Sequence, residues 1–247
     1  MELKSILVGI DGIKGSGSLD IDISNIESDS RNIKQGGLFV AIKGFEVNGN
    51  DYIKSAIDNG AVCIMTEPDI DKTLLKEIAK LVTVIVVPNA RLGLAIASCN
   101  FYDNPSKKFK LVGITGTKGK TTTSFMTKAI LEKQGLKVGL IGTIATYIGN
   151  KKLEDSDRTT PESNKLQYFF SKMAEEKCDV VVMEVSSQSL KLHRVAGCDF
   201  DVVLFTNFSE FLPGRNSVWY QKDRNPSLYN SMHTGQCRIF QTHHEWF

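Results

Sequence analysis

The chain has 247 residues, of which 41% are hydrophobic and 23% charged, with a formal net charge of +2. This length allows one large domain or two modest ones, and the nearly neutral charge gives no reason to expect nucleic-acid binding. The sequence shows neither a signal peptide nor an apolar run of membrane-spanning length, so we expect a cytoplasmic protein without membrane insertion. Its five cysteines are scattered along the chain, which favours buried or idle thiols over a metal site or a disulfide framework.

Residues 1–88 are predicted to form a small N-terminal α/β domain. The alternating run 19–24 predicts a half-exposed strand, and the apolar run 37–43 predicts a more buried one. We then expect a helix, a strand, a second helix and a further strand, at residues 52–59, 61–65, 71–81 and 82–87. A connecting helix that begins near Asn89 leads into the rest of the chain.

Residues 89–210 are predicted to form a second α/β domain, with a doubly wound and mostly parallel sheet. Strands and helices alternate there, which is the pattern of such sheets. Thr160 and Pro161 are expected to start a helix as its cap and its first residue. The ligand should bind at the carboxyl ends of the strands. The predicted strands are 109–114, 137–142, 179–185 and 201–206, and the predicted helices are 120–134 and 161–177.

A strand, a glycine loop and a helix follow one another around residues 110–134, which is the context of a phosphate-binding loop. Main-chain N–H groups near Gly116 and Gly119 can surround phosphate oxygens at the positive end of the helix. Lys120 would neutralise the β- and γ-phosphates, and the Thr121 hydroxyl would bind the accompanying Mg²⁺. The strict motif is met only in its second half, because Ile114 stands where it requires glycine. The predicted ATP-binding residues are Gly116, Thr117, Lys118, Gly119, Lys120, Thr121 and Thr122.

Glu184 is the acidic residue that we expect beside this loop. It ends the apolar run 180–183, so a buried strand would present its carboxylate at the ligand edge of the sheet. A carboxylate opposite Thr121 is what a phosphate-bound Mg²⁺ requires. We therefore predict Lys120 and Glu184 as catalytic residues, and Thr121 and Glu184 as metal ligands.

The string Thr-Gly-Thr-Lys-Gly-Lys-Thr-Thr-Thr at 115–123 is similar to the loop of the Mur ligases, which add amino acids to bacterial cell-wall precursors. Residues 28–31 (Ser-Asp-Ser-Arg) and 36–44 resemble the domain of these enzymes that binds the UDP sugar. Residues 159–163 and 183–195 resemble the MurE type, the UDP-N-acetylmuramoyl-L-alanyl-D-glutamate ligases that add the third peptide residue. The resemblance extends over about residues 20–210.

The resemblance implies an ATP-dependent amide ligase of peptidoglycan synthesis that uses ATP and Mg²⁺. Its substrates would be UDP-MurNAc-L-Ala-D-Glu and a diamino acid, meso-diaminopimelate or L-lysine, joined through an acyl phosphate by a monomeric enzyme. Ser28, Ser30, Phe45, Glu46 and Val47 would contact the UDP part of the substrate. The muramoyl-peptide side would be held by Thr159, Thr160, Ser186 and Arg194.

The tail 211–247 differs in composition, with no alanine, few aliphatic residues and both tryptophans. We expect an atypical segment there, through a frame shift, a fusion or disorder, and with it an incomplete second domain. The family's Asp-His pair after residue 207 and its carbamylated lysine are not recognisable. Two alternatives therefore stand beside the ligase: a catalytically incompetent remnant that binds ATP or UDP-muramoyl peptide, and an unrelated P-loop kinase.

Overall fold

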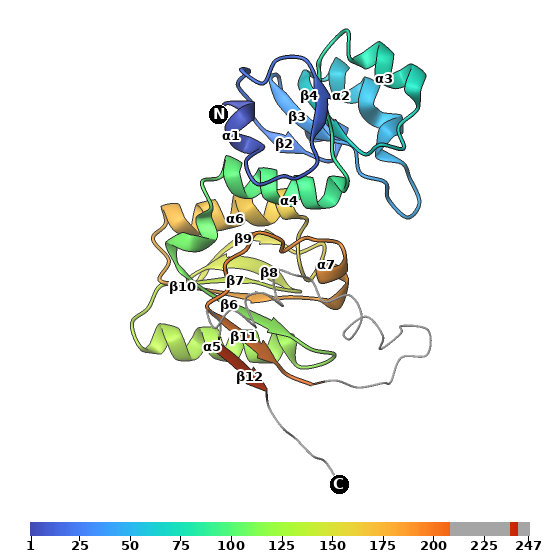
Figure 1. The fold of residues 1–247 in the computed structure, drawn as a ribbon. Coiled ribbons are helices and arrows are strands. Elements are labelled where there is room, and N and C mark those ends of the chain that lie inside the picture. The colour runs from blue at the N-terminus through green and yellow to red at the C-terminus, as the bar shows by residue number, and fades with distance from the viewer. Residues whose placement is uncertain (208–237, 242–247) are drawn as a thin grey trace. The chain divides into compact units, whose positions relative to one another are not determined.

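The computed structural model describes residues 1–207 and 238–241 of the chain. It contains two compact units, Met1–Asp103 and Asn104–Phe247, and each is described by itself (Figure 1). This division differs from the boundary at residue 88 that we expected from the sequence. The reason is α4 (Ala90–Phe101), whose residues Ala90, Leu94 and Ala97 pack in the core of the first unit.

The first unit is a five-stranded sheet in the order β1-β5-β4-β3-β2, with helices on both faces. Side chains alternate across it. Leu38 and Val40 pack with α1 and α4, whereas Phe39 packs with α2 and α3. The strands are β1 (Lys14–Ser16), β2 (Ile26–Glu27), β3 (Gly37–Val40), β4 (Ala61–Thr66) and β5 (Thr83–Val86). The remaining helices are α1 (Leu3–Ile6), α2 (Ile53–Asp58) and α3 (Lys72–Ile78), with the short 3-10 helices η1 (Ser30–Asn32) and η2 (Gly49–Tyr52).

The predicted strand at 19–24 is wrong. This segment forms only an isolated bridge between Asp22 and Glu2, and its other main-chain bonds run singly to the first residues of α1, to Met1 and to Gly36. Ile23 is buried whereas Leu19 is 43% exposed, so the alternation in the sequence reflects burial against α1 and not membership of the sheet. The other predicted elements of this unit are confirmed to within a few residues.

The second unit is a seven-stranded sheet in the order β12-β11-β6-β10-β7-β8-β9. Its parallel centre consists of β6, β7, β10 and β11, while β8 and β9 add an antiparallel edge that we did not predict. The strands are β6 (Lys110–Thr115), β7 (Val138–Ile141), β8 (Ala145–Ile148), β9 (Lys151–Asp155), β10 (Val180–Glu184), β11 (Val202–Phe205) and β12 (Arg238–Gln241). The helices are α5 (Lys120–Lys133), α6 (Ser163–Glu175), α7 (Ser187–Lys191) and the 3-10 helix η3 (Pro105–Lys108).

Helices cover both faces of this sheet, as the doubly wound prediction requires. Side chains alternate along β10: Val181 and Met183 pack in one core cluster with α6, and Val180 and Val182 pack in another with α5 (Figure 1). The strand β10 is therefore buried on both sides, which is typical of a central parallel strand. This arrangement places β10 between β6 and β7 with its carboxyl end beside theirs.

The predicted start of the second long helix is wrong by two residues. α6 begins at Ser163 with Glu162 at the cap position, and no side chain caps it. Thr160 does not cap the helix because its hydroxyl donates to the Glu184 carbonyl oxygen at 3.0 Å and accepts from the Ser186 N–H at 3.1 Å. The threonine thus joins the segment before α6 to the end of β10.

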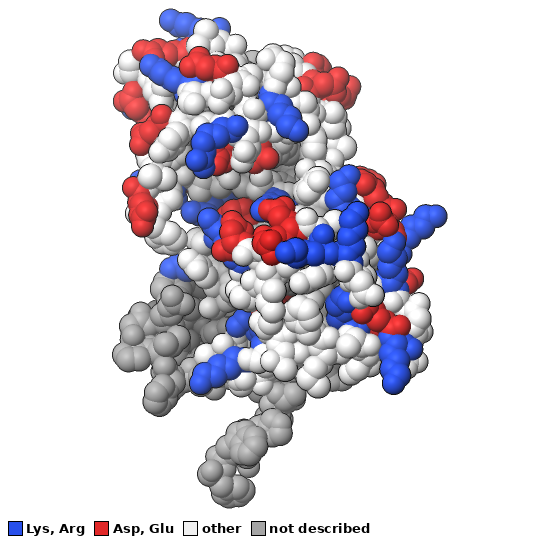
Figure 2. All heavy atoms as spheres, turned by 180° about the vertical axis from the view of Figure 1, so that it is seen from behind, with Lys and Arg blue, Asp and Glu red and all other residues white. Residues whose placement is uncertain are grey.

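Residues 208–237 and 242–247, which include most of the predicted atypical tail at 211–247, lie outside the described residues. Residues 238–241 form β12, which pairs in parallel with β11, although no strand is evident there from the sequence. Among the helices that the structure describes, none is long and apolar enough to cross a membrane. Acidic and basic side chains are intermixed on the face of the molecule in Figure 2.

Candidate functional site

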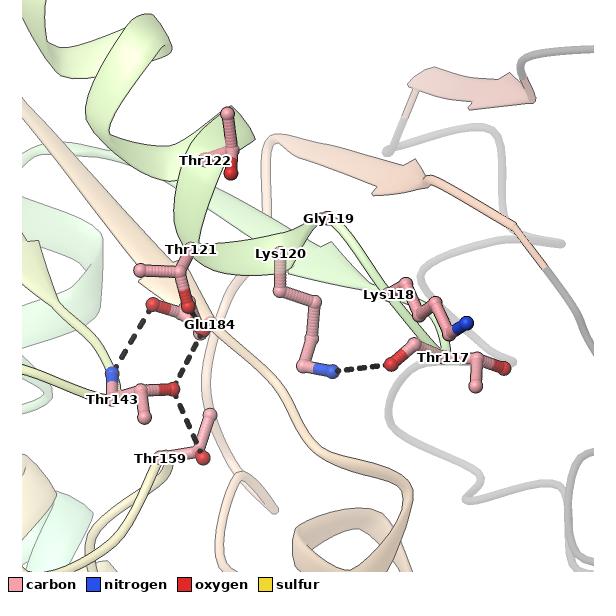
Figure 3. Close-up of a pocket in the computed structure, with 9 residues that line it drawn as sticks. All are labelled: Thr117, Lys118, Gly119, Lys120, Thr121, Thr122, Thr143, Thr159 and Glu184. Atoms are coloured by element: carbon pink, nitrogen blue, oxygen red, sulfur yellow. Dashed lines mark hydrogen bonds between the residues drawn. The ribbon is translucent and has the colours of Figure 1, made fainter. Parts of the chain in front are cut away.

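A pocket of about 200 Å³ lies at the carboxyl ends of β6, β7 and β10 (Figure 3). The sheet order brings these ends together, since β10 is hydrogen-bonded to both β6 and β7. The site therefore occupies the place predicted for a parallel sheet. Nine residues line it: Thr117, Lys118, Gly119, Lys120, Thr121, Thr122, Thr143, Thr159 and Glu184.

The loop between β6 and α5 depends on its two glycines. Gly116 and Gly119 have φ angles of +139° and +82°, a region that other residues rarely adopt. A Cβ atom on Gly116 would also collide with the Thr206 hydroxyl. Because α5 begins at Lys120, the loop leads into the positive end of a helix of 14 residues, whose first main-chain N–H groups have no partner within the helix. Such a loop fits a phosphate group.

The two lysines of the loop behave differently. The Lys120 ammonium group folds over the loop and donates to the Gly116 carbonyl oxygen at 2.7 Å, so the charge is held at the pocket. The Lys118 side chain points away from Lys120 in Figure 3. Its contribution is through the main chain, because its N–H and its carbonyl oxygen both bind Asn207, at 3.1 and 3.0 Å.

The residues that follow β11 hold the phosphate loop in place through hydrogen bonds. The Thr206 hydroxyl donates to the Lys118 carbonyl oxygen at 2.7 Å, and the Asn207 carbonyl oxygen accepts from the Thr117 N–H at 3.0 Å. Thr206 and Asn207 fall at the ligand edge that the sequence predicts. Their observed contacts are with the loop itself, and they fix its path.

Glu184 is completely buried at the end of β10, beneath the start of α5. Its carboxylate accepts hydrogen bonds from the Thr121 hydroxyl at 3.0 Å, the Thr143 N–H at 3.1 Å and the Thr143 hydroxyl at 3.0 Å. A buried carboxylate is costly unless it is satisfied in this way. The structure thus brings the two predicted metal ligands, Thr121 and Glu184, into contact.

Thr143 is the pocket residue that sequence reasoning missed. It follows Gly142 directly after β7, and its hydroxyl lies 3.1 Å from that of Thr159. The rule that places Glu184 at a strand end also places the residues after β7 at the ligand edge, but it does not single out Thr143 among them.

The predicted substrate residues of this unit lie at or just behind the pocket. Thr159 lines it, whereas Thr160 is buried. Arg194 is also buried, pairs with Glu162 at 2.7 Å and donates to the Thr160 carbonyl oxygen at 3.2 Å. Ser186 is the side-chain cap of α7. Their contacts with a substrate stay predictions.

The residues predicted to contact UDP all lie in the first unit. Ser28 is partly buried, and Ser30 is buried at the start of η1. Phe45, Glu46 and Val47 form the exposed tip of a loop that is closed by a Gly44 N–H bond to the Val47 carbonyl oxygen at 2.9 Å. Phe45 is 80% exposed, so its ring has a large apolar surface open to a ligand. The predicted UDP contacts remain untested.

The pocket has the donor set expected for Mg²⁺ with ATP phosphates. Mg²⁺ prefers oxygen ligands and is commonly bound through one or two carboxylates together with substrate phosphates. Glu184 supplies a carboxylate, Thr121 a hydroxyl and Lys120 a cation beside the loop amides. Among the described residues, no cluster of three or more His, Cys, Asp or Glu side chains offers an alternative metal site.

Comparison with known proteins assigns both units to one family. The family model of the Mur ligase middle domain matches residues 114–210, and that described as Mur ligase family, catalytic domain, matches residues 22–102. A 2,6-diaminopimelate ligase of this family from Clostridium botulinum is 55% identical over 190 residues, which are 76% of this chain and 38% of the relative. One from Clostridium tetani is 45% identical over 210 residues, 85% of this chain and 42% of the relative.

Solved structures show the same fold. The structure of a UDP-N-acetylmuramoyl-L-alanyl-D-glutamate–2,6-diaminopimelate ligase aligns with a TM-score of 0.75 at 17% identity, over 98% of this chain and 52% of the other. A MurF structure from Acinetobacter baumannii aligns with a TM-score of 0.54 at 16% identity, over 97% of this chain and 51% of the other.

The chain thus spans about two fifths of the length of these two clostridial relatives. Within that span the matches include the phosphate loop, Glu184 and the segment that resembles the UDP-sugar domain. The fold, the pocket and the two domain matches agree, and the chain belongs to the Mur ligase family.

Proposed function

We propose that the chain binds ATP and Mg²⁺ in the pocket above β6 and β10, as part of a ligase that joins a diamino acid to UDP-MurNAc-L-Ala-D-Glu. The observation that supports this most directly is the buried Glu184 carboxylate 3.0 Å from the Thr121 hydroxyl, at the head of a glycine loop. The names of the clostridial relatives favour 2,6-diaminopimelate over lysine as the added residue. We further propose a cytoplasmic, monomeric protein.

The residues of the pocket have separate tasks in this proposal. Loop amides and Lys120 bind and orient the phosphates and balance the negative charge that moves when the terminal phosphoryl group is transferred. Glu184 and Thr121 hold Mg²⁺, which supplies further charge neutralisation. Transfer of the γ-phosphoryl group from ATP to the D-glutamate carboxylate gives an acyl phosphate and releases ADP. The amine attacks the carbonyl carbon of the acyl phosphate and loses a proton, and phosphate leaves as the amide forms.

On the opposite side of the pocket from the loop, Thr159 is the candidate contact for the muramoyl peptide. Arg194 supports it indirectly, because it holds the neighbouring Thr160 carbonyl oxygen and the Glu162 carboxylate. We propose that Ser28, Ser30 and the exposed loop 45–47 bind the UDP part.

The test is to incubate the whole chain with Mg²⁺, ATP, UDP-MurNAc-L-Ala-D-Glu and 2,6-diaminopimelate, and to detect the tripeptide product by mass spectrometry. A ligase gives product together with ADP and phosphate. ATP binding without product supports instead the binding-only alternative. Absence of ATP binding contradicts the ligase and limits the binding-only alternative to the UDP-muramoyl peptide.

A further inference from the structure

Thr143 makes more contacts with Glu184 than any other residue for which a hydrogen bond to this carboxylate is described. Its N–H binds Oε1 at 3.1 Å and its hydroxyl binds Oε2 at 3.0 Å, so both carboxylate oxygens are held from one residue. The dashed lines in Figure 3 show this double contact, with Thr143 between Glu184 and Thr159. Two contacts in fixed directions restrict rotation of the carboxylate about its last bond.

Gly142 lets the main chain approach closely enough for this. A Cβ atom at residue 142 would collide with Glu184 Oε1 and lie 3.1 Å from its carboxyl carbon. Any other residue would therefore displace either the carboxylate or the turn that carries the Thr143 N–H. The turn after β7 is fitted to the Glu184 side chain.

The number of available protons decides which group donates in each hydrogen bond around Glu184. The ionised carboxylate only accepts, and a hydroxyl has one proton to donate. The Thr143 proton is therefore used on Glu184, and the bond of 3.1 Å between the two threonines is made with the proton of Thr159. In the same way, the Thr121 hydroxyl donates to Oε2, which leaves its lone pairs for a cation.

We infer that Thr143 is a positioning residue, which holds the Glu184 carboxylate in the orientation that Mg²⁺·ATP requires and links it to Thr159. This inference rests on the proposed function. Thr143 need not touch the metal, and it acts by restricting Glu184. Without the Thr143 hydroxyl, Oε2 loses one of the two hydrogen bonds described for it and keeps only the one from the Thr121 hydroxyl, so metal binding has to order the carboxylate.

The experiment compares ATP affinity with and without Mg²⁺ by calorimetry in the wild type, Thr143→Val and Thr143→Ser. Valine keeps the shape and the main-chain N–H but lacks the hydroxyl. The Mg²⁺ gain is the ratio of the ATP affinity with Mg²⁺ to the ATP affinity without it. We expect valine to lower this ratio by about tenfold, which is the effect of one lost hydrogen bond to a charged group. Affinity for ATP without Mg²⁺ should stay within about twofold, and serine should restore the wild-type behaviour.

Two further variants make the test independent of the valine. Gly142→Ala perturbs the same carboxylate from the main-chain side and should also reduce the Mg²⁺ gain. Thr127→Val makes the same chemical change on α5, away from the pocket lining, and should have no effect. If the melting temperature of Thr143→Val falls, Thr143→Ala removes the hydroxyl without adding a methyl group.

An unchanged Mg²⁺ gain in Thr143→Val overturns the inference, as does an equal loss of affinity with and without the metal. A wild-type chain whose ATP binding does not respond to Mg²⁺ overturns the proposed metal site itself, which is a different result. Failure of the positioning role is therefore distinguishable from failure of the proposed function.

Discussion

At the scale of single residues, the burial of the Glu184 carboxylate is unfavourable in free energy but suits the binding of a metal cation. Burying an unpaired carboxylate is unfavourable by several kcal/mol, and the structure offsets this with hydrogen bonds from Thr121 and Thr143. Of the two lysines that line the pocket, Lys120 donates to the Gly116 carbonyl oxygen, and no ion pair with Glu184 is described for either. The negative charge of Glu184 is thus held by dipoles, which suits a site that receives a metal cation.

Replacing Glu184 with glutamine keeps the size of the side chain and removes its charge. We expect the Mg²⁺-dependent part of ATP affinity to fall at least about tenfold, because a carboxylate ligand of the metal is lost. Calorimetric titration with ATP at several Mg²⁺ concentrations measures this. Glu175→Gln, at a side chain that is 60% exposed, is the matched control. Equal Mg²⁺ dependence in the two variants would argue against Glu184 as a metal ligand.

At the scale of elements, the phosphate loop is held by the end of β11 as much as by its own glycines. The side chain of Asn207 accepts from the Lys118 N–H and donates to the Lys118 carbonyl oxygen, like a short piece of strand pairing. The loop conformation therefore depends on a residue nearly ninety positions further along the chain.

Asn207→Ala removes both side-chain bonds to the loop. We expect ATP affinity to fall by roughly 1–2 kcal/mol, about five- to thirtyfold, because the loop has to be ordered when the phosphate binds. Asn150→Ala, in the exposed turn between β8 and β9, should leave the affinity unchanged. Titration with ATP measures the affinity of the two variants, and equal affinities would show that the loop is rigid without Asn207.

The core between α6 and the sheet allows a second prediction at this scale. Phe170 is fully buried in a cluster with Phe109 and Val181, whereas Tyr168 on the same helix is 42% exposed. Phe170→Ala should lower the free energy of unfolding of the second unit by about 3–5 kcal/mol, through lost burial and a cavity. Tyr168→Ala should cost much less. Urea unfolding followed by circular dichroism compares them, and similar midpoints would contradict this packing.

At the scale of the whole molecule, the cysteines report on burial in both units. The thiols of Cys63, Cys99, Cys178 and Cys198 are buried and form no disulfide among the described residues, while Cys237 lies outside them. Burial raises the pKa of the Cys178 thiol to about 11, so only about one molecule in a thousand carries the reactive thiolate at pH 8.

A Cys237→Ser variant should therefore react slowly with a thiol reagent at pH 8 while it is folded. The reaction should become faster as the pH rises toward 11, and all four remaining thiols should react at once in denaturant. Absorbance after mixing with a chromogenic disulfide measures this. Fast labelling of Cys178 in the native chain at pH 8 would contradict its burial.

The sequence predicts this molecule best where one residue type has one physical role. The glycine loop and the charged end of an apolar strand predict Thr121 and Glu184 as neighbours, and the hydrogen bond of 3.0 Å between them confirms it. Thr143 was missed because a threonine after a strand has many uses, and only the fold shows that Gly142 places it against the carboxylate. The cap assigned to Thr160 failed for a related reason, since its hydroxyl is used in a tertiary contact with the end of β10.

The most direct test of the account is the binding of ATP to the whole chain, with and without Mg²⁺, in the wild type and in Lys120→Met. The account predicts that the wild type binds ATP, that Mg²⁺ strengthens this binding, and that the methionine variant loses it while its melting temperature stays close to that of the wild type. A wild-type chain that does not bind ATP, or a Lys120→Met chain that binds it equally well, would contradict the assignment of this pocket.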